Sequence, residues 1–317
     1  MINVSVQIRR AVLEDQLQIA NLIHNEVTSH RHLDWRIPLE WIGSPNYWVM
    51  EEDGRHITGV LACPEDPPQV AWIRLFAYSP HTIHSFDVPG QSQARKQPEA
   101  WSALWEAARG EVLRANPQAQ IAAIAVKQWF QDILFSSGFE LNQSIILLQM
   151  IKETMGSFPT PQGIHIRPMR EADLPAVVNV DLDAFGWFWH NTLDGLSRAF
   201  SQSVSATIAE DDSGVIGYQL TTGNSFGAHL ARLGVKAEAQ GRGVGAALVS
   251  GMIQTLDSHQ LSRLTVNTQS DNAASLSLYK KLGFVRTGEQ FPVFVYPVNK
   301  MAEAARHESV NLKSNGG

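Results

Sequence analysis

An internal repeat constrains the fold of this 317-residue chain most strongly. Two distant segments match at one constant spacing of 158 positions. The matching pairs are Ile8 with Ile166, Arg9 with Arg167, Asp15 with Asp173, Gly59 with Gly217, Arg74 with Arg232, and Leu75 with Leu233. One register held over so many pairs indicates two related copies of a single folding unit. The length, about twice that of a usual domain, agrees with two domains.

Both copies predict the same order of elements, beginning with a strand, a helix and a hairpin. Residues 49–63 and 207–222 each predict two strands joined by a turn that contains glycine. Each copy later predicts a helix ending in Gly-Phe, at Gly138 and at Gly283, followed by an apolar strand. The spacing between the copies has dropped to 145 there, so the N-terminal copy carries extra residues before this helix. The alternation of strands and helices predicts an α/β fold.

The predicted boundary between the copies lies near residue 158. Residues 152–163 are rich in glycine and proline and predict a linker. We therefore expect one domain over residues 1–157, a second over 158–300, and a polar tail over 301–317.

Composition limits the classes of partner. With 44% hydrophobic and 18% charged residues, the chain should form globular cores. A net charge of -6 without a long basic stretch argues against nucleic acid or an anionic membrane, and no apolar run has membrane length. The N-terminus lacks the layout of a secretion signal, which predicts a cytoplasmic protein, as a monomer or homodimer. The single cysteine, Cys63, has no His or Cys at metal-ligand spacing, so we expect no metal.

A glycine-rich turn in the C-terminal copy is the main candidate binding site. It joins a predicted strand over residues 229–236 to a helix that begins at Val244. The turn comprises Gln240, Gly241, Arg242, Gly243, Val244, Gly245 and Ala246. Unpaired amides at a helix N-terminus suit phosphate oxygens, and the missing side chains allow close approach. Arg242 could add a charge-assisted contact.

Three further interpretations compete for this turn. The glycines could simply relieve crowding at a tight corner. Gly241, Gly243 and Ala246 also satisfy a G-x-G-x-x-A dinucleotide pattern, but five residues separate the first glycine from the strand, and the next strand lacks the acidic residue. A nucleoside-triphosphate loop is excluded because no Gly-Lys-Ser/Thr follows.

A second motif narrows the choice. After the next predicted strand come Asn272, Ser275, Leu278, Tyr279, Lys281, Leu282, Gly283 and Phe284. Together with the Gln-x-x-Gly-x-Gly turn, this order resembles the GNAT superfamily of N-acetyltransferases over residues 164–297. The resemblance implies two tandem GNAT-like domains, each a mixed, mostly antiparallel sheet flanked by helices. It also implies acetyl-CoA as co-substrate.

The family's roles can be transferred to matching positions only. The resemblance implies that residues 240–246 bind the pyrophosphate. It places Leu233, Gly234 and Val235 along the pantetheine arm, with an amide near Leu233 polarising the thioester carbonyl. Tyr279 would protonate the departing thiolate, and Asn272 would contact the pantetheine or the strand opening. Asn272, Ser275 and Tyr279 share one helix face by their spacing.

The sequence gives fewer indications of which residues would bind or deprotonate the acceptor amine. Residues 225–236 contain no Asp or Glu, so His229 is the titratable candidate for a general base, although a lone histidine on a strand is more often structural. An aromatic run falls where the family usually recognises its acceptor, and it could form a substrate wall or fill a core. It comprises Phe185, Trp187, Phe188, Trp189 and His190.

The N-terminal copy lacks both the glycine-rich turn and the tyrosine. At the repeat spacing, Thr82, Ser85 and Asp87 stand where the turn should be, and Leu134 stands at the position of Tyr279. We therefore expect a single coenzyme site per chain. The sequence predicts an N-acetyltransferase that acts on an amine of a small molecule or protein. A non-catalytic module that binds acyl-CoA and regulates a partner is the alternative.

Overall fold

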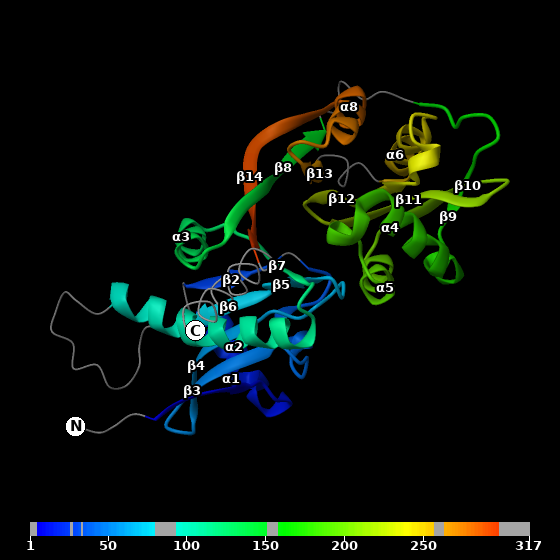
Figure 1. Cartoon of the computed structure of the whole chain (residues 1–317). Coiled ribbons are helices and arrows are strands. Elements are labelled where there is room, and N and C mark those ends of the chain that lie inside the picture. The colour runs from blue at the N-terminus through cyan, green and yellow to red at the C-terminus, as the bar shows by residue number, and fades with distance from the viewer. Residues whose placement is uncertain are drawn as a thin grey trace, which may run out of the picture. The chain divides into compact units, whose positions relative to one another are not determined.

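The computed structural model describes residues 5–25, 28–32, 34–79, 93–150, 158–256 and 263–297, with side chains omitted at 93–98. The chain forms two compact units (Figure 1). Unit 1 comprises residues 1–142 and 292–317, and unit 2 comprises residues 143–291. No helix among the described residues is long and apolar enough to cross a membrane.

Unit 1 contains a five-stranded sheet of order β1-β3-β4-β6-β2 and a smaller set in which β7 lies between β5 and the end of β14. The elements that supply it are β1 (Val6–Arg10), α1 (Gln16–Asn25), β2 (Ser29–Arg31), β3 (Tyr47–Glu52), β4 (His56–Ala62), β5 (Val70–Trp72), β6 (Leu75–Tyr78), α2 (Gln93–Ala115), β7 (Gln120–Ile124), α3 (Gln128–Ser136) and the end of β14 (Phe284–Tyr296).

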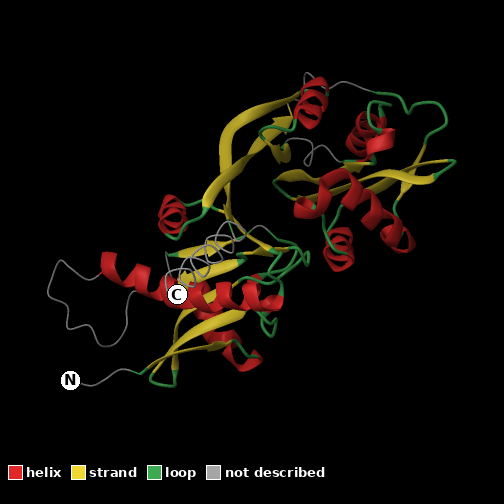
Figure 2. Ribbon diagram, in the orientation of Figure 1, coloured by secondary structure: helices red, strands yellow, loops and turns green. Residues whose placement is uncertain are grey.

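Unit 2 contains the strands β8-β13-β12-β11-β10-β9 of the nine-stranded sheet, in that order, and β14 follows beside β8. Figure 2 shows the helices and strands of the chain. All neighbouring strands from β8 to β9 are antiparallel except the parallel pair β12 and β13, as expected for a mixed sheet. The elements are β8 (Glu140–Met150), β9 (His165–Pro168), α4 (Leu174–Trp189), α5 (Leu193–Ser201), β10 (Ser205–Asp211), β11 (Gly214–Asn224), β12 (Gly227–Val235), α6 (Val244–Thr255), β13 (Leu264–Gln269) and α8 (Ala273–Lys281).

The two units do not divide the chain at one point. In unit 2, residues 145–149 of β8 pair with β13, although they precede the expected linker. In unit 1, residues 293–296 of β14 pair with β7, although they lie at the far end of the second copy. Each unit thus contains strand residues from the other half of the sequence. The boundary at residue 158 remains a prediction about where one repeat ends and the next begins. The packed units divide elsewhere, within β8 and within β14.

Each unit holds the same partly buried ion-pair triplet, which supports the predicted repeat. An arginine on the first strand makes two hydrogen bonds to an aspartate at the start of the first helix, at 2.7 and 2.9 Å in unit 1 and 2.8 and 2.9 Å in unit 2. The same arginine also pairs with a glutamate on the hairpin. The residues are Arg9, Asp15 and Glu51 in unit 1 and Arg167, Asp173 and Glu210 in unit 2.

The two repeated glycines permit a helix to approach the hairpin closely. A Cβ atom on Gly59 would lie 3.1 Å from the Leu104 side chain of α2. A Cβ atom on Gly217 would lie 3.2 Å from both the Gly234 carbonyl and the Val244 side chain of α6. The helices α2 and α6 therefore occupy equivalent places in the two units.

Alanine at these glycines should destabilise the chain. We expect Gly59→Ala and Gly217→Ala each to lower the free energy of unfolding by about 1–3 kcal/mol, because the added methyl overpacks the helix contact. Gly110→Ala in α2 and Gly251→Ala in α6 are matched controls, since nothing lies within 4 Å of their Cβ positions. Urea titration measures the four variants. Equal effects at all four positions would remove the close-approach explanation.

Candidate active site

The glycine-rich turn joins the end of β12 to α6, as predicted. A short 3-10 turn, Ala237–Ala239, follows β12, and Gly243 is the residue that precedes the helix. Gly241 and Gly243 have φ angles of +75° and +85°, which favour glycine because other side chains crowd the backbone there. Asp183 on α4 accepts a hydrogen bond from the Ala237 amide at 2.6 Å and so fixes the start of the turn.

Most amides of this turn are unpaired, and only that of Gln240 donates, to the Ala237 carbonyl at 3.3 Å. No described residue accepts a hydrogen bond from the main-chain N–H groups of residues 241–246. They gather at the positive end of the α6 dipole, which favours an anion. A Cβ atom on Gly245 would meet Leu278 of α8 at 3.2 Å, so this glycine also lets the two helices approach each other. The turn therefore fits a phosphate group in both charge and shape.

The two polar side chains of the turn have partners within unit 2. The Gln240 side-chain amide donates to the Val235 carbonyl at 3.1 Å and ties the turn to the strand end. Arg242 pairs with Asp211 at 3.0 Å and remains half exposed. Binding of an anion through Arg242 would therefore compete with this exposed ion pair, which itself stabilises little.

Beside the turn, β12 separates from β13. The parallel pairing covers only Ala228, His229 and Leu230 on β12. On its other edge β12 remains paired with β11, but the register shifts so that Ala231 is an extra, bulged residue. A bulge bends the strand that carries it and interrupts the ladder. The strands thus part immediately after Leu230, and the rest of β12 has a free edge on the β13 side.

The strand register shows which of Leu233, Gly234 and Val235 face this opening. The Lys236 amide donates to Ile216 of β11, so by alternation the main chain of Gly234 also faces β11. Leu233 and Val235 then face the opening, and the Gln240 contact on the Val235 carbonyl agrees with that direction. Gly234 has another reason to be glycine, because a Cβ atom there would lie 2.7 Å from the Tyr218 ring.

Tyr279 lies on α8 beneath the sheet and is 4% exposed. It shares a buried cluster with Leu230 and Val266, the last paired residues of β12 and β13, and its ring contacts Phe284 at 5.5 Å. Its hydroxyl has no partner among the described residues and is not fully enclosed. Burial raises the pKa of Tyr279 well above its ordinary value, so the side chain is a protonated donor at neutral pH.

Asn272 has a clear structural role. It precedes α8, and its side-chain oxygen accepts a hydrogen bond from the Ser275 amide at 3.0 Å. This is the geometry of a helix N-cap. Asn272 therefore fixes the start of the helix that carries Tyr279, and a contact with a ligand stays a prediction for both Asn272 and Ser275.

His229 lies on the opposite face of the sheet from Tyr279. Its neighbours Ala228 and Leu230 belong to the Tyr279 cluster, and side chains alternate along a strand. His229 Nδ1 lies 2.8 Å from Thr265 Oγ1, while Nε2 has no partner among the described residues. Burial lowers the pKa of His229, so the imidazole is neutral at pH 7. The two predicted catalytic residues thus flank the closed end of the opening from opposite sides.

Comparison with known proteins agrees with this geometry. Residues 174–284, which carry the turn, the opening and Tyr279, match the Acetyltransferase (GNAT) family. This part of the chain belongs to the GNAT family. The match covers α4 through α8, so we refer to unit 2 as the GNAT unit.

Curated relatives carry one name. The chain is similar to the mycothiol acetyltransferase of Amycolatopsis mediterranei, at 29% identity over 52% of this chain and 64% of that protein. It is also similar to that of Kocuria rhizophila, at 31% identity over 40% of this chain and 47% of that protein. The alignments thus span about half to two thirds of these relatives.

Solved structures share the fold over almost the whole chain. A tandem GNAT protein from the clavulanic acid biosynthesis pathway has a TM-score of 0.58 at 14% identity, covering 92% of this chain and 98% of that one. A GCN5-related N-acetyltransferase from Anabaena variabilis has a TM-score of 0.63 at 14% identity, covering 93% and 73%. The predicted α/β fold with two GNAT-like domains is confirmed.

Sequence reasoning missed a buried polar cluster in the GNAT unit. Arg232 of β12 makes two hydrogen bonds to Asp181 of α4, at 2.7 and 2.9 Å, and the Tyr218 hydroxyl also donates to Asp181. Arg232 donates further to the Trp189 carbonyl at 2.6 Å and stacks over the Phe185 ring. The repeated pair Arg74 and Arg232 was the available signal, because Arg74 pairs with Asp34 in unit 1 at 3.1 Å. The repeated arginine thus pairs with an aspartate in both units, although Asp34 and Asp181 do not stand at equivalent positions of the repeat.

The aromatic run of residues 185–190 lies next to this polar cluster. The backbone leaves helical geometry at Gly186, whose φ is +68°. Phe185 is stacked under Arg232, which is a packing role, whereas Trp187 is 49% exposed. Phe188 makes edge-to-face contacts with both neighbouring tryptophans. The run thus divides into a packed part and an exposed part that could meet a substrate.

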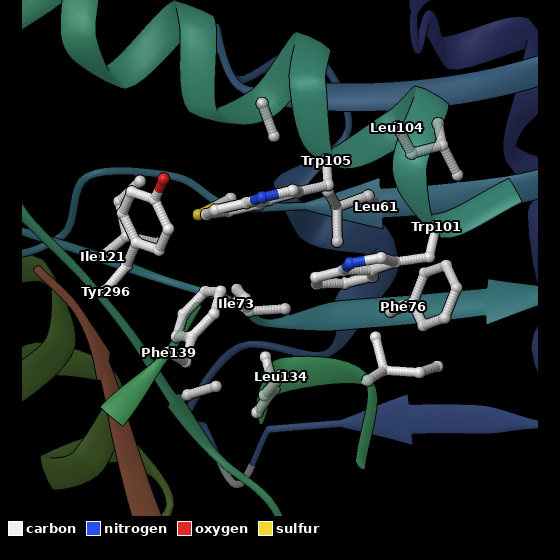
Figure 3. Close-up of a cluster of buried hydrophobic side chains, with 14 of the residues drawn as sticks. Leu61, Ile73, Phe76, Trp101, Leu104, Trp105, Ile121, Leu134, Phe139 and Tyr296 are labelled. Atoms are coloured by element: carbon white, nitrogen blue, oxygen red, sulfur yellow. The ribbon is translucent and has the colours of Figure 1, made fainter. Parts of the chain in front are cut away.

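In unit 1 the equivalent region holds a buried cluster that includes several aromatic rings (Figure 3). The strand that corresponds to β12 is broken there, since β5 pairs with β7 while β6 pairs with β4. Phe76 of β6, Trp101 of α2 and Phe130 of α3 are all buried and lie within 5.0 to 6.2 Å of one another. In the GNAT unit the equivalent elements carry Gly234, Gly245 and Tyr279. Leu134 is buried, whereas Thr82, Ser85 and Asp87 lie outside the described residues.

Among the described residues, no three His, Cys, Asp or Glu side chains come together in a way that could hold a metal ion. Cys63 is fully buried beside the Ala71 carbonyl, and burial raises its thiol pKa. The groups of the described site that could take part in chemistry are its main-chain amides, Tyr279 and His229.

Proposed function

We propose that this chain is an N-acetyltransferase that moves the acetyl group of acetyl-CoA to an amine, with its one active site in the GNAT unit. The observation that carries the proposal is the run of unpaired amides at residues 241–246, placed beside the opening between β12 and β13. Unpaired amides alone would suit any small anion, and a parted strand edge alone would suit any extended peptide-like group. Together they suit a ligand with a pyrophosphate at one end and an extended arm.

The coenzyme would be held mostly by main chain. The turn from Gln240 to Ala246 would bind the pyrophosphate, and the free edge of β12 at Leu233 and Val235 would pair with the amide groups of the arm. From Val235 back to Leu230 the strand covers about 16 Å, at about 3.3 Å per residue. The reacting thioester would then lie near the closed end of the opening.

At that end, the two titratable residues have complementary protonation states. The amine nitrogen attacks the thioester carbonyl carbon, the carbon–sulfur bond breaks, and the sulfur leaves as a thiolate. Tyr279 is protonated and can give its proton to the sulfur, while neutral His229 can take the proton that the amine loses. Attack is direct, so both substrates are bound at once and no acetyl-enzyme forms.

The acceptor is an amine of a small molecule or a protein. The curated relatives are named mycothiol acetyltransferases, and we take from them the transfer of an acetyl group. Release of free thiol from acetyl-CoA, measured with a panel of amines, tests the proposal. We expect release that depends on an amine. Binding of acetyl-CoA without turnover of any amine would instead support the non-catalytic sensor.

The pH dependence should report His229. Because a base must be neutral, kcat/KM should fall as the pH drops through the pKa of His229. Burial lowers that pKa from the ordinary value of 6.5, so the acid limb of the profile should lie below pH 6.5. We expect His229→Gln to lower kcat/KM at pH 8 by about 10-fold to 100-fold and to remove this limb. An unchanged profile would show that water or another group accepts the proton.

A further inference from the structure

A pocket of about 260 Å³ lies in the GNAT unit at the start of β12. It is lined by parts of β8, β11, β12 and β13, including Leu147, Thr222, His229 and Thr265, and by Arg263 at the head of β13. Because these four strands are neighbours in the sheet, the pocket is a hollow on one sheet face. None of the residues assigned to the coenzyme lines it.

The pocket adjoins the closed end of the opening. His229 and Thr265 are paired with each other, and the next pair, Leu230 with Val266, is the last before the strands part. The pocket thus ends within about 7 Å of the point where β12 and β13 separate, since two residues of a strand span about 3.3 Å each. It shares the face of His229 and lies across the sheet from Tyr279. A molecule in it could direct one nitrogen toward His229 Nε2 and the parting point.

The lining of this pocket has an unusual charge balance for a chain of net charge -6. No Asp or Glu lines it, and its polar groups are the hydroxyls of Thr222 and Thr265, the Asn224 amide, the His229 ring and Arg263. No described carboxylate pairs with Arg263. Asp181, the buried carboxylate on this face, already binds Arg232 and Tyr218. A guanidinium that no described carboxylate neutralises favours an anion and disfavours a second ammonium group.

We infer that this pocket binds the amine acceptor, and that the acceptor carries an anionic oxygen group, a carboxylate or a phosphate, that pairs with Arg263. The inference rests on the proposed function, since it names the substrate class of the same site. It excludes polyamines and lysine-rich protein segments as preferred acceptors, because their additional positive charges would face Arg263 without a carboxylate in the lining.

Matched pairs of amines test this inference. Glucosamine 6-phosphate against glucosamine tests a phosphate, and phenylalanine against phenethylamine tests a carboxylate. For at least one pair, the wild-type chain saturated with coenzyme should favour the anionic member by about 10-fold to 100-fold, both in kcat/KM and in affinity measured by calorimetry. Arg263→Gln should abolish the preference, and Arg263→Lys should restore part of it. Arg286→Gln, an exposed arginine of β14 outside the pocket, is the matched control and should keep it.

The outcomes separate this inference from the proposed function. Turnover without preference for the anionic member, a preference that survives Arg263→Gln, or binding of no member of either pair overturns the inference while leaving acetyl transfer standing. Failure of the chain to bind acetyl-CoA overturns the proposed function. Spermine, a polyamine without an anionic group, tests the opposite preference. A spermine kcat/KM above that of both anionic amines would contradict an anion-binding pocket.

Discussion

Gly243→Asp should weaken acetyl-CoA binding by roughly 1,000-fold, because it places a carboxylate among the amides that would hold the pyrophosphate. Two like unit charges 5 Å apart repel each other by about 3 kcal/mol at an effective dielectric constant of 20, and a pyrophosphate carries more than one negative charge. The side chain would also occupy the unpaired amides itself, as an N-cap aspartate does. Isothermal titration with acetyl-CoA measures the effect.

Gly243→Asn separates charge from shape in this experiment. Asn and Asp have nearly the same size, and both tolerate positive φ better than other side chains. A Cβ atom at this position would lie 3.3 Å from the Pro161 ring, so both variants carry the same crowding. We expect the Asn variant to bind acetyl-CoA much more tightly than the Asp variant. Similar affinities would show that the turn holds no phosphate.

Tyr279→Phe should lower kcat by about 100-fold to 10,000-fold with little change in acetyl-CoA affinity, because it removes a general acid and keeps the ring. Burial raises the pKa of Tyr279 well above its ordinary value, so the lost group is a proton donor throughout the neutral range. Thiol release with a working amine measures the rate, and calorimetry measures the affinity.

The stability of this variant supplies the control. The Tyr279 hydroxyl has no partner among the described residues, so its loss should change the free energy of unfolding by less than about 1 kcal/mol. Tyr218→Phe removes a hydroxyl that donates to buried Asp181 and should cost about 1–3 kcal/mol. If Tyr279→Phe slows the reaction only in proportion to lost stability, Tyr279 is a packing residue.

Local pattern predicted the elements that carry the site. The spacing of glycines at residues 241–245 and the apolar face that follows identified the turn and α6, because both depend on short-range geometry. The repeat spacing also identified Gly59 and Gly217, although nothing in their neighbouring residues accounts for a glycine there. The close approach of α2 and α6 to the two hairpins explains them.

Long-range pairing could not be predicted in the same way. The exchange of residues 145–149 and 293–296 between the two units depends on which strands pair, and nothing in an apolar strand's sequence identifies its partner. The Asp181 cluster was missed for a similar reason, since Asp181 and Arg232 lie far apart in the sequence. The bulge at Ala231 likewise arises from pairing between β11 and β12.

Calorimetric titration of the whole chain with acetyl-CoA is the decisive measurement, because the number bound distinguishes a single site in the GNAT unit from two equivalent sites. The equivalent region of unit 1 holds the buried rings of Phe76, Trp101 and Phe130, so we predict one acetyl-CoA per chain and none measurable in the Gly243→Asp variant. Two molecules per chain, or one that remains bound with wild-type affinity in that variant, would overturn the assignment of a single coenzyme site to the glycine-rich turn.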